Sequence, residues 1–285
     1  MLIDGKMLAD TILSNLRSRV AALAAEGVVP TLAVIQVGDN PASMAYIRQK
    51  QKAADNIGAR LIFDHQTASV TGGGLYNLIA KYNSDPSVHG LIIQRPIPEE
   101  VGRVDDVLVK VQKAKDVDGF LPDSPFEVPV AAAVGEILQS ILTNTKDTND
   151  FANWLRKKKI VVIGRGGTAG TPIATYFQKL ECATSIIHSQ TSHPEKILRS
   201  ADIIISCVGK ERVVTGKSIT PGCILISVGI WRDALGKLHG DYDESDISSI
   251  AGWYTPTPGG VGPVNVACLM KNVIKACTIQ KGGQL

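Results

Sequence analysis

The stretch KKKIVVIGRGGTAGTPIATYF, residues 157–177, restricts the fold of this chain more than any other segment. The β-branched run at 160–163 is typical of a strand buried on both faces of a sheet. A glycine-rich turn follows, and Thr171–Pro172 opens a helix, because proline is tolerated in the first helical turn. Free backbone N–H groups and the helix dipole converge there, so the segment predicts an anion-binding turn.

The glycines of this turn are Gly164, Gly166 and Gly170, with the spacing G-x-G-x-x-x-G. That spacing is one residue longer than the usual dinucleotide fingerprint. Glycine also serves any tight turn between a strand and a helix, so the spacing alone leaves a structural interpretation open.

Three further apolar runs favour the nucleotide-binding interpretation. They cover residues 183–189, 201–209 and 222–230, and short helix-compatible segments separate them. Strands that alternate with such crossovers form doubly wound parallel sheets. We therefore expect a Rossmann-like domain in this part of the chain.

The end of the run at 183–189 favours NADP over NAD. An NAD site normally places Asp or Glu there to bind the ribose hydroxyls, whereas this chain has His188-Ser189-Gln190-Thr191. No carboxylate is present to repel a 2′-phosphate, and Arg165 in the glycine turn can attract one. The alternative is a solvated arginine and a serine that belongs to a turn.

Length and composition predict a globular protein of two domains, since the chain has 285 residues. Its net charge of +3 is too small to predict a nucleic-acid partner, yet it is compatible with an acidic substrate. The five cysteines are odd in number and lack C-x-x-C spacing, which predicts buried thiols in a reducing, cytoplasmic compartment. We expect no signal peptide, no membrane span and no metal site.

The first half of the chain predicts a second unit of alternating strands and helices. Its strands are expected at 31–37, 60–63 and 89–94, and its helices at 43–56 and after the glycines at 72–74. Chemistry in such sheets lies beyond the carboxyl ends of the strands.

The helix at 43–56 carries a lysine on its apolar side. With residues spaced about 100° apart, Lys50 projects into the same arc as Ile47, and Ser43 and Tyr46 flank it. Burying an ammonium is costly unless it is paired or its pKa falls. Lys50 is therefore either a lysine placed for chemistry or a snorkelling side chain whose charge reaches water.

Tyr46-x-x-x-Lys50 also occurs in short-chain dehydrogenases. In those enzymes the pair follows the glycine turn within the same domain, whereas here it precedes the turn by more than a hundred residues. We therefore set that family aside.

Three other segments carry candidate site residues. Gln94 ends a predicted strand and can both donate and accept hydrogen bonds. The loop at 115–119, KDVDG, has alternating aspartates, so only one of them can point inward, although either can simply cap a turn. The Pro/Gly-rich run at 255–263 predicts a rigid loop that lets a ligand approach the backbone, and a helix is expected from Val264 to about Ala276.

Taken together, these segments resemble the methylenetetrahydrofolate dehydrogenase/cyclohydrolase family over nearly the whole chain. The matching pieces are VGDNPASMAYIRQKQKAADNIG, LIAKYNSDPSVHGLIIQRPIP, KDVDG, VVIGRGGTAGTPIA, HSQT and TPTPGGVGP. The resemblance implies two α/β domains, each with a mostly parallel sheet, and a cleft between them. Residues 1–128 plus 264–285 would form the folate-binding catalytic domain, and 129–263 the Rossmann-like NADP-binding domain.

The resemblance also implies the site residues. The catalytic set would be Lys50, Tyr46, Gln94 and Asp118, with Lys50 as the catalytic lysine and Tyr46 stacked on the pterin. The substrate would contact Ser43, Tyr46, Gln94, Asp118, Pro258, Gly259 and Gly260. NADP would contact Gly164, Arg165, Gly166, Gly170, Ser189 and Ile230.

The implied function is the NADP-dependent oxidation of 5,10-methylenetetrahydrofolate and hydrolysis of the methenyl product to 10-formyltetrahydrofolate. It belongs to one-carbon metabolism and supplies purine biosynthesis. The implied partners are tetrahydrofolate derivatives, polyglutamylated forms among them, and a second copy of the chain in a homodimer formed through the cofactor domain.

Several positions depart from the family pattern and leave alternatives open. They are Val130-Ala131-Ala132, Arg95, Asn265 and Gly166. One alternative is a monofunctional dehydrogenase of the same family, and another is a nucleotide sensor with impaired catalysis. A shikimate-type dehydrogenase is a third, which the Pro-Gly-Gly-Val-Gly-Pro loop disfavours.

Overall fold

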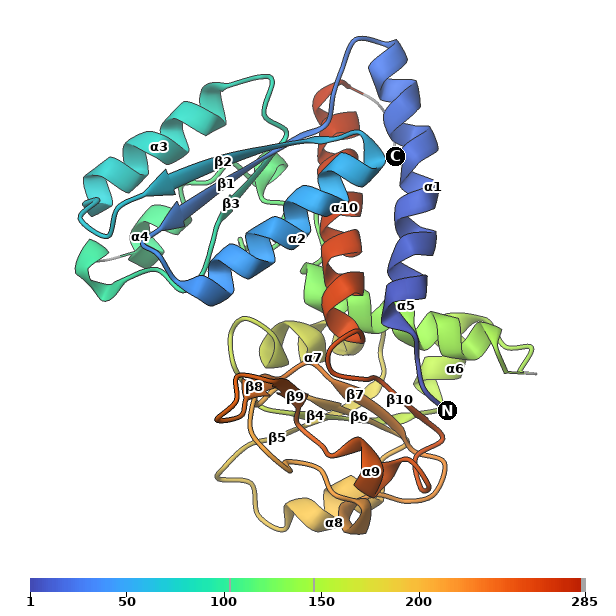
Figure 1. The fold of residues 1–285 in the computed structure, drawn as a ribbon. Helices are drawn as coiled ribbons and strands as arrows, with labels where there is room; N and C mark the ends of the chain where they lie inside the picture. Colours follow the sequence, from blue (N-terminus) through green and yellow to red (C-terminus); the bar gives the residue numbers. More distant parts are fainter. Residues whose placement is uncertain (103, 146, 283–285) are drawn as a thin grey trace. The chain divides into compact units, whose positions relative to one another are not determined.

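The computed structural model describes residues 1–102, 104–145 and 147–282. The chain divides into two compact units, each of which contains a parallel sheet (Figure 1). The glycine-turn unit comprises Met1–Ala9 and Val130–Asn265, and the Lys50 unit comprises Asp10–Pro129 and Val266–Leu285. The predicted α/β fold with two mostly parallel sheets is confirmed.

The sheet of the glycine-turn unit has the strand order β10-β7-β6-β4-β5, and every pairing within it is parallel. Its strands are β4 (Lys159–Ile163), β5 (Ala183–Ile187), β6 (Ile203–Ser206), β7 (Ile224–Ser227) and β10 (Trp253–Tyr254). The helices are α5 (Pro129–Thr143), α6 (Phe151–Arg156), α7 (Gly170–Lys179), α8 (Pro194–Arg199) and α9 (Glu244–Ile247). Unbroken burial along β6 and β7 explains their apolar sequences, because helices or loops cover both faces.

The sheet of the Lys50 unit has three parallel strands in the order β2-β1-β3. They are β1 (Thr31–Val37), β2 (Arg60–Gln66) and β3 (Gly90–Ile93). The accompanying helices are α2 (Pro41–Ile57), α3 (Gly72–Ser84) and α4 (Val104–Leu108). Helices α1 (Gly5–Ala25) and α10 (Val261–Gln280) contribute residues to both units. The central strand β1 is buried along its whole length.

Several predicted boundaries differ from the observed ones. The strand predicted at 60–63 runs to Gln66, the run at 201–209 contains a strand only at Ile203–Ser206, and α10 ends at Gln280 rather than near Ala276.

Two further differences concern the predicted site. The run at 222–230 is not one strand: β7 ends at Ser227, and Ile230 begins an antiparallel hairpin of β8 (Ile230–Arg232) and β9 (Leu238–Gly240). Helix α10 begins at Val261 rather than Val264. Its proline at position 263 is accommodated because the N–H groups of the first turn need no intrahelical acceptor.

The N-terminal residues group with the glycine-turn unit, although residue 1 was expected to begin the other domain. The amino group of Met1 donates to Gly252 O at 2.6 Å. Ile3 N donates to Tyr254 O at 2.9 Å, and Leu2 forms a parallel bridge to Tyr254. These backbone bonds extend the edge of the sheet at β10.

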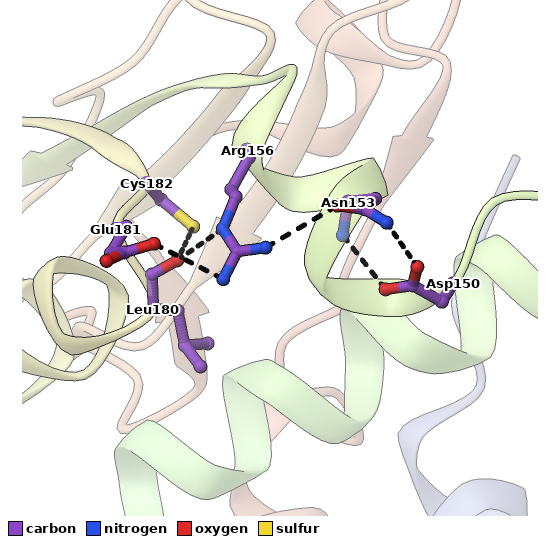
Figure 2. A network of polar contacts seen from close by, with 6 residues as sticks. All are labelled: Asp150, Asn153, Arg156, Leu180, Glu181 and Cys182. Carbon is purple, nitrogen blue, oxygen red and sulfur yellow. Dashed lines mark hydrogen bonds and ion pairs between the residues drawn. The ribbon is translucent and has the colours of Figure 1, made fainter.

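A polar network joins α6 to the turn between α7 and β5 (Figure 2). Arg156 Nε donates to Leu180 O at 3.3 Å, and its Nη2 lies 3.4 Å from Glu181 Oε2. Its Nη1 donates to Asn153 Oδ1 at 3.4 Å. Because α6 leads into β4 and Leu180 precedes β5, the network links the amino ends of these strands. The glycine turn lies at their opposite, carboxyl edge.

None of the helices in the described part of the chain is long and apolar enough to cross a lipid bilayer.

Candidate active site

Helix α2 is capped at both ends. Asn40 Oδ1 accepts hydrogen bonds from Ala42 N at 3.0 Å and Ser43 N at 3.1 Å, which satisfies two donors of the first turn. Gly58 ends the helix in the left-handed region at φ 79°. The face that contains Ile47 is buried, as predicted from the spacing.

Lys50 lies at the edge of that buried face and is half-buried itself. Its Nζ donates a hydrogen bond to Gln94 Oε1 at 2.8 Å. Gln94 follows β3, and its backbone N donates to Ile35 O at 2.8 Å. Its side-chain Nε2 donates to Arg95 O at 2.9 Å, which turns the amide oxygen toward the lysine. The structure therefore brings together two residues that the sequence predicted for one site.

Asp118 is coupled to Lys50 through their charges. Burial lowers the pKa of Lys50, and the carboxylate of Asp118 partly offsets this effect. Burial raises the pKa of Asp118, which the charge of Lys50 opposes and the charge of Asp116 increases. Burial therefore favours the neutral amine of Lys50 and the protonated acid of Asp118 over their charged forms. Such paired shifts are typical of groups that move protons.

The other charged residues of the KDVDG loop have structural roles. Lys115 is buried, and its Nζ donates to the carbonyls of Tyr82 at 2.8 Å and Asp85 at 2.7 Å at the end of α3. Asp116 is also buried, and its Oδ2 accepts from Leu121 N at 3.0 Å. The two aspartates thus differ, because Asp116 is buried and holds the loop while Asp118 is half-buried and interacts with the charge of Lys50.

The remaining residues predicted for the folate site in this unit, Ser43 and Tyr46, lie on α2 with Lys50. Ser43 Oγ donates to Arg95 O at 3.2 Å, which joins the start of α2 to the end of β3. Tyr46 is half-buried and lies one turn before Lys50 on α2. The sequence analysis did not assign Arg95 to the site, although its charge lowers the pKa of Asp118. The signal that could have pointed to Arg95 was its position directly after Gln94, where a cation departs from the family pattern.

The glycine turn has the close backbone approach that a nucleotide site requires. A Cβ added to Gly170 would lie 2.1 Å from Gly164 O, so only glycine lets α7 begin directly on the turn. Gly164 has φ 100° and donates from its N to Ile187 O at 2.8 Å. A Cβ on Gly166 would meet no atom within 4 Å, so its backbone faces open space. The turn is a cradle into which an anion fits.

Arg165 and the segment after β5 lie together, as predicted for a 2′-phosphate site. Arg165 is exposed, and its Nη2 donates to Gln190 Oε1 at 3.4 Å. Ser189 is exposed in the same turn, which His188 N closes by donating to Thr191 Oγ1 at 2.9 Å. A cation and a hydroxyl are therefore available to a phosphate, and this turn carries no carboxylate.

The other predicted contact residues also belong to the glycine-turn unit. Ile230 is exposed at the start of β8. The loop with Pro258, Gly259 and Gly260 is held by Thr257 N, which donates to Glu244 Oε1 at 3.2 Å. Their contacts with cofactor and substrate stay predictions. Among the described residues, no group of His, Cys, Asp and Glu could hold a metal ion.

Comparison with known protein families gives two matches. Residues 3–118 match the tetrahydrofolate dehydrogenase/cyclohydrolase catalytic domain. Residues 139–281 match the NAD(P)-binding domain of the same enzymes.

Individual relatives agree with these matches. The bifunctional protein FolD of Albidiferax ferrireducens is 37% identical over 281 residues, which cover 96% of this chain and 95% of the relative. The crystal structure of the bifunctional methylenetetrahydrofolate dehydrogenase/cyclohydrolase FolD from Campylobacter jejuni is 32% identical, with a TM-score of 0.91 over 98% of this chain and 99% of the other. The Trypanosoma brucei enzyme, solved with NADP cofactor and an inhibitor, is 30% identical, with a TM-score of 0.88 and coverage of 98% and 97%.

Proposed function

The chain belongs to the tetrahydrofolate dehydrogenase/cyclohydrolase family, and we propose that it performs both reactions of that name. It oxidises 5,10-methylenetetrahydrofolate with NADP and hydrolyses the resulting methenyl compound to 10-formyltetrahydrofolate. The observation that carries this proposal is the hydrogen bond from Lys50 to Gln94 beside the coupled carboxylate of Asp118. The family resemblance assigns the chemistry to these three residues, which supports the proposal.

The glycine-turn unit fits NADP. Its turn offers backbone N–H groups and the start of α7 to the pyrophosphate, and Arg165 offers a cation to the 2′-phosphate. NADP, when bound, supplies the acceptor for the hydride that leaves the methylene carbon. The protein contributes binding and orientation to this step.

In the Lys50 unit, we assign proton transfer to Lys50. The oxidised folate is a methenyl cation, and a fixed ammonium beside it would oppose its charge. Because burial lowers the pKa of Lys50, the amine can lose its proton and reduce that repulsion. The neutral amine can then accept the proton of the attacking water, and its ammonium form can donate to the ring nitrogen as the ring opens.

Gln94 and Asp118 hold the reacting groups in position, Gln94 the lysine amine and Asp118 the pterin. Gln94 holds the lysine amine through its amide oxygen, so the amine is positioned before substrate binds. The carboxylate of Asp118 suits the amino and ring N–H donors of the pterin, because a charge-assisted pair fixes both position and orientation. Tyr46, one turn from Lys50, provides an aromatic face on which the pterin can stack.

We further propose a homodimer formed through the glycine-turn unit, a cytoplasmic location, and a role in supplying one-carbon units to purine biosynthesis. Polyglutamylated folates are among the proposed substrates. Light scattering of the purified protein tests the dimer, because a monomeric mass at micromolar concentration would contradict it.

One assay tests the proposed function. Wild-type protein receives methylenetetrahydrofolate and NADP, while the nicotinamide and methenyl absorbances are followed together. Reduction of NADP without accumulation of the methenyl compound is the expected result. Accumulation of the methenyl compound would show a monofunctional dehydrogenase. Absence of NADP reduction would refute the proposed dehydrogenase activity.

A further inference from the structure

A buried carboxylate in the glycine-turn unit has no role in the reactions described above. Asp241 directly follows β9, and its exposed fraction is 0%. Burying an ionised carboxylate is costly unless hydrogen bonds compensate for the lost water. Asp241 also contacts the carboxyl ends of β6 and β7, which is the edge where sheets of this kind bind ligands.

Each oxygen of Asp241 accepts two hydrogen bonds. Its Oδ2 accepts from Ser206 Oγ at 2.5 Å and from Val208 N at 2.9 Å. Its Oδ1 accepts from Gly209 N at 2.8 Å and from Lys210 N at 2.9 Å. Three successive backbone N–H groups thus point at one carboxylate. Such a row is an anion-binding nest, and here a side chain of the protein itself fills it.

Asp241 also determines the conformation of the loop after β7. Ser227 Oγ accepts from Asp241 N at 2.9 Å and donates to Gly229 O at 3.0 Å. A Cβ added to Gly229 would lie 2.3 Å from both Asp241 Oδ2 and Gly209 N, so only glycine permits this packing. Ile230, one of the residues predicted to bind cofactor, follows directly. Asp241 therefore joins the loops after two neighbouring strands, the loop after β6 through its carboxylate and the loop after β7 through its backbone N–H and the close packing of Gly229.

A doubly wound domain binds one mononucleotide half of a dinucleotide on each half of its sheet. In this unit the glycine turn and Arg165 serve the phosphates and the 2′-phosphate. The loops after β6 and β7 are then left for the nicotinamide half. Since Asp241 already occupies the nest at 208–210, those N–H groups are not available to a cofactor phosphate.

We propose that Asp241 is a positioning residue for NADP, which holds residues 207–210 and Gly229–Ile230 in the shape that receives the nicotinamide half. The inference rests on the proposed function, because it assumes that NADP binds this unit. Asp241 acts through the backbone of these loops and not by contact with the reacting atoms.

The substitution Asp241→Asn tests the proposal. An amide has one acceptor oxygen in place of two, so its NH₂ group must face at least one of the three backbone N–H donors, and that donor loses its acceptor. The dissociation constant of NADP should rise about 10- to 100-fold in a direct titration. That of NAD should rise by the same factor, because both cofactors share the nicotinamide half. Folate binding should not change.

Asp243→Asn is the matched control, because it removes the same charge from an exposed carboxylate, which accepts its hydrogen bonds from Ser245 two residues away. It should bind NADP as wild type does. Ser206→Ala removes one of the four bonds and should raise the NADP dissociation constant about three- to tenfold. If Asp241→Asn does not fold, Ser206→Ala decides the question.

Unchanged NADP affinity in Ser206→Ala and Asp241→Asn would overturn the inference. Equal losses of NADP and folate binding would do so too, since they would show a general structural role. A wild-type protein that binds no NADP would instead refute the proposed function.

Discussion

Each of the two units has its site at the carboxyl ends of the strands of its own parallel sheet, but the two sites are built from different groups. In the Lys50 unit the site consists of side chains: Lys50 donates a hydrogen bond to Gln94, and the charges of Lys50 and Asp118 shift each other's pKa. In the glycine-turn unit it consists mostly of backbone, in the turn at 164–170 and in the loop at 207–210, whose N–H groups are held by Asp241. The first arrangement suits proton transfer, and the second suits the binding of a cofactor that brings its own chemistry.

Burial has opposite chemical consequences in the two units. It lowers the pKa of Lys50 and so favours the neutral, reactive amine. It raises the pKa of Cys207, which follows β6, to about 12, with the charge of Asp241 as a second cause. The thiol of Cys207 is therefore kept protonated and unreactive beside the cofactor loops. Desolvation therefore favours the reactive, neutral form of Lys50 in one unit and the unreactive, neutral form of Cys207 in the other.

The largest expected effect follows from removing the amine of the Lys50 unit. Lys50→Met should slow the cyclohydrolase step about 10²- to 10⁴-fold, the usual contribution of general acid–base catalysis. The dehydrogenase step should lose less, because a methionine of similar length largely preserves the geometry, so the methenyl compound should accumulate in the coupled assay. Lys52→Met, on the exposed side of the same helix, is the control. Hydrolysis at the wild-type rate in Lys50→Met would show that Lys50 is a snorkelling residue.

The next largest effect is expected on folate binding, with NADP binding left intact. Asp118→Asn should weaken folate binding about 10- to 150-fold and slow both reactions, since it removes a charge-assisted pair with the pterin. NADP binding, titrated by itself, should persist. Asp123→Asn, an exposed aspartate that lies 3.5 Å from Lys113 Nζ, should leave both unchanged. A matching loss of NADP affinity in Asp118→Asn would mean that this aspartate supports the structure as a whole.

The smallest effect is expected at the exposed cation of the glycine-turn unit. Arg165→Ala should raise the NADP dissociation constant about tenfold, near the lower limit for a charge-assisted bond because solvent screens this side chain. NAD binding should hardly change, because NAD lacks the 2′-phosphate. Arg199→Ala removes the same charge from the same unit and serves as the control. Similar losses with both cofactors would make Arg165 a structural residue.

The sequence predicted most of the regular elements because their patterns are local. The strand at 31–37 was predicted with its observed bounds, and Ile47 does lie on the buried face of α2. The hairpin of β8 and β9 was missed, because the apolar run at 222–230 continues through the bend, where Gly229 packs closely against Asp241. Periodicity cannot reveal such a contact between distant segments.

The site was predicted unevenly for the same reason. Lys50 could be found because a lysine on an apolar arc conflicts with its surroundings. Its bond to Gln94 could not be derived, since 44 residues separate the two side chains in the chain. Asp241 gave no signal, because aspartate beside glycine reads as an ordinary turn and its four donors come from residues about 30 positions earlier.

A titration of the Lys50 amine by NMR tests the central claim most directly, with the signal assigned by its absence from Lys50→Met. The claim is that the Lys50 unit holds a desolvated amine coupled to Asp118. The midpoint should lie below 10.5 in the wild type, and lower still in Asp118→Asn, because the carboxylate raises the pKa of Lys50. A midpoint at or above 10.5 that does not respond to Asp118→Asn would contradict it.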